Sequence, residues 1–390
     1  MRHWGVTGTN GKTTTTWIAA AFINADPSRK CGYVTTVEVN TGTRQFYTGY
    51  TTPPLAQLKE IFAEMERNGC TDCVMEVSSH AIHQHRTGDT VFSGGAFTNL
   101  SEDHLDYHKT MEAYFDVKLD FARQIAAKNP QPSDGRRDFP PYVVCLDGGY
   151  GREMFNACGG LPVNVLPVTF AKPRFDLTGL QLVGDYNKSN VLVAAELAEA
   201  AGVSHGVIQG VIPTLKPRWG RLEEVKSKSE EVKSRIFVDF AHTPDGLEKV
   251  LTAVRGMMNS TSSSTSTSSL HLPSLWVVFG AGGDRDPMKR PLMGAACAKL
   301  ADRLVVTSDN PRSEDPMKII EAILGGIDSE KRRFVEVEPD REKAIHFALI
   351  HAAEDDVVII AGKGHETTQE IKGVKHPFDD REVVRGFLGK

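Results

Sequence analysis

Long apolar runs are absent from this sequence of 390 residues, and no segment approaches the ~18 consecutive apolar residues that a membrane-spanning helix needs. Basic charge is also short, because 45 Lys and Arg stand against 50 Asp and Glu, and the formal net charge is -5. That balance leaves no basic field to hold nucleic acid, so we expect any bound nucleotide to be a small one. Met1 precedes the first motif by only a few residues, which leaves no room for a signal peptide, and we expect a cytoplasmic protein without a membrane partner.

Cysteine is scarce as well. The six cysteines are scattered through apolar or loop-like segments, which suits reduced thiols better than a disulfide framework: Cys31, Cys70, Cys73, Cys145, Cys158 and Cys297. Cys70 and Cys73 form a CxxC pair, but no second Cys or His pair follows at ligand spacing, and Cys73 opens an apolar run. We therefore interpret the pair as packing residues, in preference to a metal or redox site.

Short apolar runs separated by helix-length segments are what the sequence has in place of long ones. Such alternation predicts mostly parallel sheets with helices on their faces, and 390 residues are too many for one ordinary core. We expect a helix over residues 13–24 and strands over residues 3–6, 73–77, 142–146, 163–170, 236–239, 275–280, 303–307 and 357–361. The grouping of these strands predicts two α/β domains that meet near residues 218–221.

Two segments have the composition of insertions. Residues 259–269 are almost all Ser and Thr, and residues 128–141 are rich in Pro, Arg and Asp. Neither composition can bury enough apolar surface to offset the entropy lost on ordering, so we expect both to be mobile surface loops.

The first expected strand runs into the sequence GTNGKT at residues 8–13 and then into a helix, which is typical of a phosphate-binding loop. Glycines let backbone N–H groups approach phosphates, the helix N-terminus adds positive potential, Lys12 reaches the outer phosphates and the Thr13 hydroxyl can bind Mg²⁺. The spacing departs from the common form, since Val6 stands where that form has its first glycine. A glycine-rich turn without a ligand is the alternative. The residues predicted to hold nucleotide phosphates are Gly8, Thr9, Asn10, Gly11, Lys12, Thr13 and Thr14.

A phosphate loop alone indicates a nucleotide and nothing more, but further motifs follow it in order. They occupy residues 5–16, 75–80 with 84–86, 98–108, 220–223, 239–245, 282–286, 309–312 and 362–366. In these stretches the sequence resembles the Mur ligase family, and within it the enzymes that add the third residue of the peptidoglycan stem peptide. The resemblance implies an α/β protein with a P-loop central ATPase domain over residues 1–218 and a Rossmann-like C-terminal domain over residues 219–390. It also implies an ATP-dependent acid–amino-acid ligase that works through an acyl phosphate.

Formation of an acyl phosphate requires stabilisation of charge on the γ-phosphoryl group and on the attacking carboxylate, which Mg²⁺ ions would supply. The resemblance assigns catalytic roles to Lys12, Glu76, His104 and Lys118, and it assigns metal contacts to Thr13 and to the last three of these. Taken alone, Glu76 at a strand end would be interpreted as solvated or ion-paired, and Lys118 as an ordinary lysine on the solvated face of a helix. The spacing of Lys118 from residues 104–108 matches the family lysine that becomes carbamylated. Carbamylation would turn a cation into an anion whose two oxygens can orient Mg²⁺.

The same resemblance extends to the rest of the ATP site and to the acyl donor. The second domain must close onto the first to complete the ATP site. An ordinary surface arginine and a turn aspartate are the alternatives for the two ATP contacts of that domain. The implied ATP contacts are Asn187, Asn190, Arg221 and Asp239. The implied contacts to the acyl donor are Thr51, Thr52, Ser78, Gln84 and Arg86.

Residues 309–312 indicate the acceptor amino acid. In the resembled enzymes an arginine at the position of Arg312 accompanies diaminopimelate, whose distal carboxylate its fork can hold, whereas lysine-adding relatives lack it. Glu366 would receive the distal ammonium. An arginine that is simply exposed to solvent beside a proline is the alternative. The acceptor contacts implied by the resemblance are Arg285, Asp309, Asn310, Arg312, Gly362 and Glu366.

The sequence departs from the family pattern in one respect. The family carries a domain of ~100 residues before the phosphate loop, which holds a uridine diphosphate sugar, and this sequence has none. Three explanations stay open: a truncated chain, a partner chain that supplies the missing domain, or a smaller acyl donor. The hypotheses are a diaminopimelate-adding ligase, the same chemistry on a small acid in a specialised pathway, and a non-catalytic nucleotide-binding protein. ADP release separates them, because a ligase needs both acid and amine, whereas a nucleotide switch needs neither.

Overall fold

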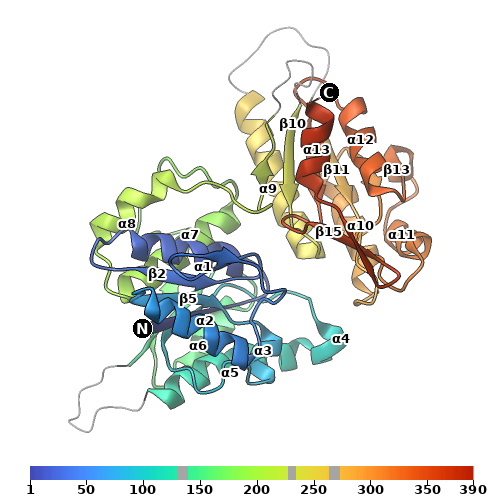
Figure 1. Ribbon diagram of the computed structural model, residues 1–390. Coiled ribbons are helices and arrows are strands. Elements are labelled where there is room, and N and C mark those ends of the chain that lie inside the picture. Colours follow the sequence, from blue (N-terminus) through green and yellow to red (C-terminus); the bar gives the residue numbers. More distant parts are fainter. Residues whose placement is uncertain (130–138, 227–233, 263–272, 390) are drawn as a thin grey trace, which may run out of the picture. The chain divides into compact units, whose positions relative to one another are not determined.

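The computed structural model describes residues 1–129, 139–226, 234–262 and 273–389 (Figure 1). The chain divides into two compact units, Met1–Lys216 and Pro217–Lys390. The boundary predicted from the sequence lies after residue 218. Each unit has its own mostly parallel sheet.

The N-terminal unit is built on an eight-stranded sheet in the order β4-β3-β2-β5-β1-β6-β7-β8. The six strands from β2 to β8 in this order run parallel, whereas β3 and β4 pair antiparallel at one edge. The strands are β1 (Arg2–Thr7), β2 (Cys31–Val34), β3 (Val39–Asn40), β4 (Gln45–Phe46), β5 (Asp72–Glu76), β6 (Phe92–Phe97), β7 (Pro141–Cys145) and β8 (Asn164–Val168). The helices are α1 (Lys12–Asn24), α2 (Leu55–Arg67), α3 (Ser79–His83), α4 (Leu105–His108), α5 (Met111–Lys128), α6 (Gly151–Cys158), α7 (Asp185–Ala200), α8 (His205–Val211) and the short η1 (Ile212–Thr214).

Helices cover both faces of this sheet (Figure 1). α1 and α7 pack against each other on one face, and the apolar core of the other face joins α2, α5 and α6 to the strands. β1 lies between β5 and β6, which both follow it in the chain, so the winding of the sheet reverses at β1. Ligands of doubly wound proteins bind beyond the carboxyl ends of the strands at such a point. The sheet order therefore places the expected phosphate loop, directly after β1, where a ligand site is expected.

The central strand β6 was missed by the sequence analysis. Its sequence FSGGAF has two adjacent glycines, which are depleted in strands because they carry no side chain to pack. Close approach explains both glycines: a Cβ added at Gly94 would stand 2.7 Å from Pro141 O, and one at Gly95 would stand 2.7 Å from Ile125 and 3.0 Å from the Phe121 ring of α5. Gly5 of β1 lies opposite Gly95, and a Cβ added there would stand 2.3 Å from the same ring. The absent side chains let a buried aromatic ring lie directly on the sheet.

The C-terminal unit has a six-stranded sheet in the order β13-β12-β11-β14-β10-β9, in which all neighbours except β10 and β9 are parallel. A separate antiparallel hairpin consists of β15 and β16. The strands are β9 (Glu223–Glu224), β10 (Arg235–Asp239), β11 (Leu275–Phe279), β12 (Arg303–Val306), β13 (Val335–Val337), β14 (Val357–Ala361), β15 (Thr368–Ile371) and β16 (Val374–Pro377). The helices are α9 (Pro244–Ser262), α10 (Lys289–Leu300), α11 (Pro316–Leu324), η2 (Lys331–Phe334), α12 (Arg341–His351) and α13 (Asp380–Leu388).

The predicted α/β class with mostly parallel sheets is confirmed, and every expected strand segment coincides with an observed strand. The cysteines are buried free thiols, as expected. No helix in the described parts of the chain is long and apolar enough to cross a membrane.

The expected loop at residues 259–269 is partly wrong. Its first four residues, 259–262, continue α9, because a helix anchored by buried residues such as Leu247 and Val254 can add further residues at little cost. Residues 263–269 of that loop lie outside the described residues. Of the other expected loop, Lys128 ends α5 and Pro141 starts β7, while residues 130–138 lie outside the described residues.

The packing at Gly5 predicts a stability difference between two glycine-to-alanine changes. Gly5→Ala should lower the free energy of unfolding by ~1–3 kcal/mol, because the added methyl overpacks against the Phe121 ring. Gly210→Ala is the matched control: it is exposed in α8 with nothing within 4 Å of its added Cβ, and it should stabilise by ~0.5–1 kcal/mol through helix propensity. Urea unfolding of both variants measures the difference, and equal stabilities would contradict the packing argument.

Candidate active site

The phosphate loop lies between β1 and α1 in a conformation that requires glycine at two positions. Gly8 has φ 148° and Gly11 has φ 84°. A Cβ on Gly8 would stand 1.9 Å from Thr98 Oγ1, and a Cβ on Gly11 would stand 2.2 Å from Asn190 Oδ1. The loop is thus pressed between the end of β6 and helix α7. Asn190, one of the predicted ATP contacts, lies directly against it.

Side chains from the end of β6 fix the backbone of this loop. Asn10 N donates to Asn99 Oδ1 at 3.0 Å, and Thr98 Oγ1 and Asn99 Nδ2 both donate to Asn10 O, at 2.7 and 3.0 Å. Lys12, the first residue of α1, donates from Nζ to Gly8 O and Thr9 O at 3.0 and 2.8 Å. The loop is therefore preorganised by the protein alone, with its lysine folded over it.

Glu76 joins the predicted metal and acyl residues at the carboxyl end of β5. Its carboxylate is buried and accepts from Thr36 N at 2.8 Å and Thr36 Oγ1 at 3.1 Å. Its backbone oxygen accepts from Thr52 Oγ1 at 2.9 Å, and the same hydroxyl accepts from Ser78 N at 3.0 Å. Thr51 Oγ1 lies 3.0 Å from Thr36 Oγ1 and can donate to it, because the Thr36 hydroxyl hydrogen is directed to the carboxylate. These bonds gather the segments at 51–52 and 76–78 around one carboxylate.

The remaining two residues predicted for the acyl donor belong to the same cluster. Arg86 Nε donates to Gln84 Oε1 at 2.8 Å, and Arg86 Nη1 donates to Thr52 O at 3.4 Å. The structure thus brings together all five residues predicted for the acyl donor.

Lys118 is buried, contrary to what composition alone suggests, with 1% of its surface exposed. It comes from α5, and its Nζ donates to Gly8 O at 2.9 Å and to Thr7 Oγ1 at 3.2 Å. Burial, with the nearby Lys12 ammonium, lowers the pKa of Lys118 well below its usual value, although Asp103 and Glu76 act in the opposite direction. The neutral amine form of Lys118 is therefore much easier to populate than that of a solvated lysine.

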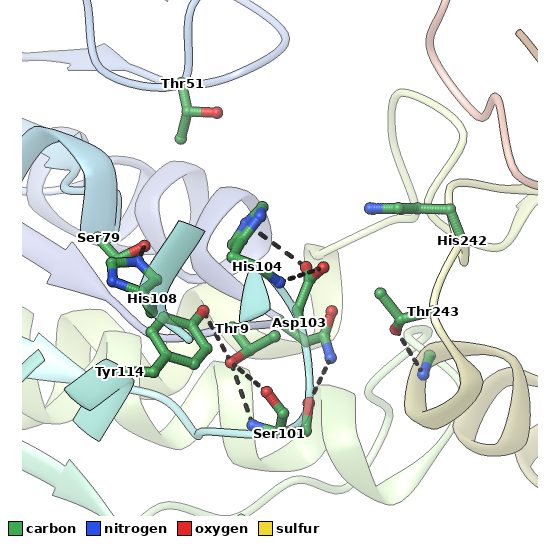
Figure 2. A network of polar contacts seen from close by, with 12 residues as sticks. Thr9, Thr51, Ser79, Ser101, Asp103, His104, His108, Tyr114, His242 and Thr243 are labelled. Carbon is green, nitrogen blue, oxygen red and sulfur yellow. Dashed lines mark hydrogen bonds and ion pairs between the residues drawn. The ribbon is translucent and has the colours of Figure 1, made fainter. Parts of the chain in front are cut away.

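His104 is held beside Asp103 in a left-handed backbone conformation with φ 56° (Figure 2). Its backbone N–H donates to Asp103 Oδ1 at 2.9 Å, and its Nε2 lies 3.5 Å from Asp103 Oδ2. Burial lowers the pKa of His104 to about 4, against the pull of Asp103. The imidazole is therefore neutral near pH 7, which is the form that binds metal ions.

A chain of buried polar side chains, of which only Thr9 was predicted as a site residue, lies next to these residues (Figure 2). His108 Nε2 lies 2.9 Å from Ser79 Oγ, and its ring stacks on Tyr114 at 4.8 Å. Tyr114 OH lies 3.1 Å from Thr9 Oγ1, which accepts from Ser101 N at 3.1 Å. The chain ties the start of α3 to the phosphate loop. One signal was available, because Tyr114 precedes Lys118 by four residues and so shares its helix face.

In the C-terminal unit, the two predicted ATP contacts are neighbours at the end of β10. Asp239 is buried and accepts from Leu222 N at 2.6 Å and Ala241 N at 2.7 Å. Burial raises the pKa of Asp239, and the Arg221 guanidinium opposes this rise. Arg221 lies over the Phe240 ring at 4.4 Å. Both side chains are thereby held at the carboxyl edge of this sheet.

The predicted acceptor residues gather at the same edge of this unit. Asn310 Nδ2 donates to Glu366 Oε2 at 2.8 Å, and the buried Lys363, which was not predicted, donates to Asn310 Oδ1 at 3.1 Å and Glu366 Oε2 at 2.9 Å. A Cβ on Gly362 would stand 2.5 Å from Asp309 Oδ2, so this glycine is required for the close approach. Four of the six acceptor candidates are thus in direct or near contact.

Arg312 and Arg285 complete the acceptor set on two adjoining loops. Arg312 has φ 51°, donates from Nη1 to Gly283 O and lies with Nε 3.8 Å from Glu370 Oε2. Arg285 is exposed on the loop that follows β11, and this loop bonds to the Arg312 loop through Gly283 N and Asn310 O at 2.9 Å. The Arg312 side chain is thus held in place by the Gly283 carbonyl and the Glu370 carboxylate.

Comparisons with known proteins agree with these motifs. A family model for the Mur ligase middle domain matches residues 6–132, and one for the Mur ligase glutamate ligase domain matches residues 220–364. The UDP-N-acetylmuramoyl-L-alanyl-D-glutamate–2,6-diaminopimelate ligase of Aquifex aeolicus is 38% identical over 397 residues, which cover 99% of this chain and 77% of that protein. The ligase of the same name from Geobacillus kaustophilus is 38% identical over 405 residues, with 98% and 78% covered. A solved structure of a ligase with this name has a TM-score of 0.60 and 31% identity, over 100% of this chain and 78% of that one.

The loop geometry predicts the effect of alanine at Gly8 on nucleotide binding. Gly8→Ala should weaken binding of a non-hydrolysable ATP analogue by more than about tenfold, because the methyl would displace Thr98 and with it the loop backbone, and 1.4 kcal/mol already corresponds to tenfold. Gly69→Ala is the control: it also places a methyl group at a positive φ, 76°, but outside the loop and with nothing within 4 Å of its added Cβ. Calorimetric titration of both folded variants measures the affinity. Equal affinities of the two variants would show that the close approach of Gly8 to Thr98 is not needed for nucleotide binding.

Proposed function

Because the chain belongs to the Mur ligase family, whose members are ATP-dependent ligases that form carbon–nitrogen bonds, we propose that it couples a diaminopimelate-like amino acid to a glutamyl carboxylate. The donor named by its relatives is a UDP-N-acetylmuramoyl-L-alanyl-D-glutamate. The observation that carries the proposal is the charge arrangement around Asn310: its amide binds the Glu366 carboxylate, and Arg312 follows two residues later. An anionic side chain bonded to this segment and a cationic side chain on it suit an acceptor whose far end carries both an ammonium and a carboxylate.

The reaction divides into two steps that the residues above can support. In the first, a donor carboxylate oxygen attacks the γ-phosphorus of ATP, the bond to the bridging oxygen breaks and ADP leaves. In the second, the unprotonated acceptor amine attacks the acyl carbon, phosphate leaves with the bonding electrons, and the amine nitrogen gives up a proton. Lys12 suits the outer phosphates, and the cluster of Thr51, Thr52 and Ser78 around Glu76 suits the donor carboxylate. Asn187 and Asn190 of α7 are proposed as further ATP contacts, together with Arg221 and Asp239 of the second unit.

Mg²⁺ fits the donor set of the N-terminal unit. We propose that Thr13, Glu76, His104 and carbamylated Lys118 hold it, and when bound it would neutralise charge at the transferred phosphoryl group. The fit rests on the chemistry of these donors: a buried hydroxyl, a buried carboxylate and an imidazole kept neutral by burial. Within the described residues no group of three or more His, Cys, Asp or Glu side chains is placed to hold a metal ion. Mg²⁺ at a nucleotide site takes few protein ligands and completes its shell with phosphates and water.

The burial of Lys118 supports its proposed carbamylation. A neutral amine attacks CO₂, a nitrogen–carbon bond forms, and the nitrogen loses a proton to give a carbamate anion. The lowered pKa of Lys118 supplies the neutral amine, and conversion to an anion would replace the repulsion between Lys118 and Lys12 with attraction. The position directly beside Gly8 O puts this group at the phosphate loop.

Removal of the Lys118 side chain tests this role. Lys118→Ala should lose most ligase activity while it retains binding of the ATP analogue, and bicarbonate or a short carboxylate should restore part of the turnover, because the variant loses an anion and not the phosphate loop. Lys128→Ala is the matched control, since Lys128 lies on the same helix and also donates to backbone carbonyls, of Gly88 and Thr90. Undiminished turnover in folded Lys118→Ala without additives would rule out the carbamate.

Removal of the Arg312 guanidinium tests the acceptor. Arg312→Ala should raise the KM for diaminopimelate about 10- to 100-fold and leave the KM for ATP unchanged, since a charge-assisted bidentate contact contributes roughly 1.5–3 kcal/mol. Lysine should then be as good a substrate as diaminopimelate for the Arg312→Ala variant. Arg303→Ala serves as control, because Arg303 is exposed at the amino end of β12, away from the carboxyl edge. If lysine is as good a substrate as diaminopimelate for the unmutated protein, the proposed acceptor is wrong.

A further inference from the structure

A buried ion pair that no motif of the sequence analysis contains lies beneath the proposed acceptor residues. Arg341 is the first residue of α12 and Asp380 is the first residue of α13, and both side chains are 0% exposed. Arg341 Nε donates to Asp380 Oδ1 and Nη2 donates to Asp380 Oδ2, each at 2.8 Å. The guanidinium is thus held in a planar, two-point contact that lysine could not reproduce.

The remaining donors of this guanidinium bind the ends of two strands. Arg341 Nη1 donates to Ser308 O at 3.3 Å, and Nη2 donates to Ala361 O at 2.9 Å. These carbonyls immediately precede Asp309 and Gly362, two of the proposed acceptor contacts. One side chain therefore holds the backbone at both positions from below.

The two strands so connected are not neighbours in the sheet. β11 lies between β12 and β14, so no ladder hydrogen bonds set the distance between the ends of β12 and β14 directly. Arg341 Nη2 would also stand 3.9 Å from a Cβ on Gly362, at the point where the Asp309 carboxylate packs against that glycine. Burial acts to lower the pKa of Arg341, but Asp380 outweighs it, and the charges of Asp309 and Glu366 add to the rise. The guanidinium is therefore in electrostatic contact with the acceptor site.

We infer that Arg341 and Asp380 are positioning residues for the amino-acid acceptor: the pair sets the separation of the segments that begin at Asp309 and Gly362. This inference rests on the proposed function only for the identity of the acceptor. A buried ion pair is in general weak evidence for stability, because desolvation offsets the attraction, so a role in geometry gives the pair a purpose that stability alone does not.

The chain offers a matched control at the opposite edge of the same sheet. Arg255 Nη2 pairs with Asp302 Oδ2 and donates to Leu300 O at 3.0 Å, beside the amino ends of β11 and β12. This second pair also combines a carboxylate with a backbone carbonyl. Loss of Arg255 should perturb the C-terminal unit without reaching the carboxyl edge where the acceptor residues lie.

The experiment compares Arg341→Met, Asp380→Asn and Arg255→Met in the full chain. Hydrogen exchange should rise in the Arg341 and Asp380 variants at residues 309–312 and 362–366 and stay unchanged there in Arg255→Met. The KM for the acceptor should rise at least about tenfold in Arg341→Met, as loss of substrate positioning predicts. The KM for ATP and the acceptor-independent formation of acyl phosphate, trapped with hydroxylamine, should stay within about twofold of the unmutated protein, as expected of a residue that serves only the second step.

Each outcome decides the inference. It is overturned if the acceptor KM stays constant in a folded Arg341 variant, or if turnover and trapping fall in proportion while both KM values stay unchanged, as they would with a smaller folded fraction. If Arg341→Met does not fold, Asp380→Asn, which keeps the volume and removes the charge, gives the same test. Failure of the proposed function can be told apart from failure of this inference. If the proposed acceptor is wrong, the unmutated protein will prefer another amino acid. The positioning role is then tested by the rise in KM for that amino acid in the variants and by the hydrogen exchange data.

Discussion

The carbonyl oxygen of Gly8 is the point on which the N-terminal half of the site depends. It accepts from Lys12 Nζ at 3.0 Å and from Lys118 Nζ at 2.9 Å, so one backbone atom brings two lysines together. Their mutual repulsion, added to burial, lowers the pKa of Lys118. The oxygen can occupy this position only because Gly8 has no side chain to meet Thr98. A backbone constraint thus creates the electrostatic one, and the uncommon chemistry proposed for Lys118 follows from both.

The two units solve the same problem with different means. In each, functional residues follow the carboxyl ends of parallel strands, which is where doubly wound sheets place their ligand sites. The N-terminal unit fixes them with hydrogen bonds from hydroxyl and backbone N–H groups, as around Glu76 and along the chain from Ser79 to Thr9. The C-terminal unit uses buried charges instead, with Lys363 beneath Glu366 and Arg341 beneath two strand ends. Charge suits an acceptor site that must distinguish ionic groups, because unpaired charges there are costly.

Much of the fold followed from local sequence, and most of the site from motif order. Apolar runs predicted the strands that carry the site, and GTNGKT predicted the phosphate loop. β6 was not predicted because glycines weaken a local strand signal. The Phe121 ring that packs against Gly95 lies on a helix 26 residues later in the chain, and only the fold brings the two together. The burial of Lys118 escaped for the same reason, since periodicity around it does not reveal which helix face meets the loop. Arg341 and Asp380 are 39 residues apart, and no local sequence pattern around either residue predicts that they form a pair.

The position of β14 has a consequence for the synthesis of the chain. β14 lies between β10 and β11, which precede it by more than a hundred residues and by about eighty, so the centre of the C-terminal sheet is filled by its last parallel strand to be made. Until residues 357–361 have left the ribosome, β10 and β11 each expose an unpaired edge. The ion pair of Arg341 can form only later, after Asp380 has been synthesised. The N-terminal unit, whose strands are all made by residue 168, faces no such delay. Vectorial synthesis therefore leaves the C-terminal half of this protein as the part that most needs protection from aggregation while it is being made.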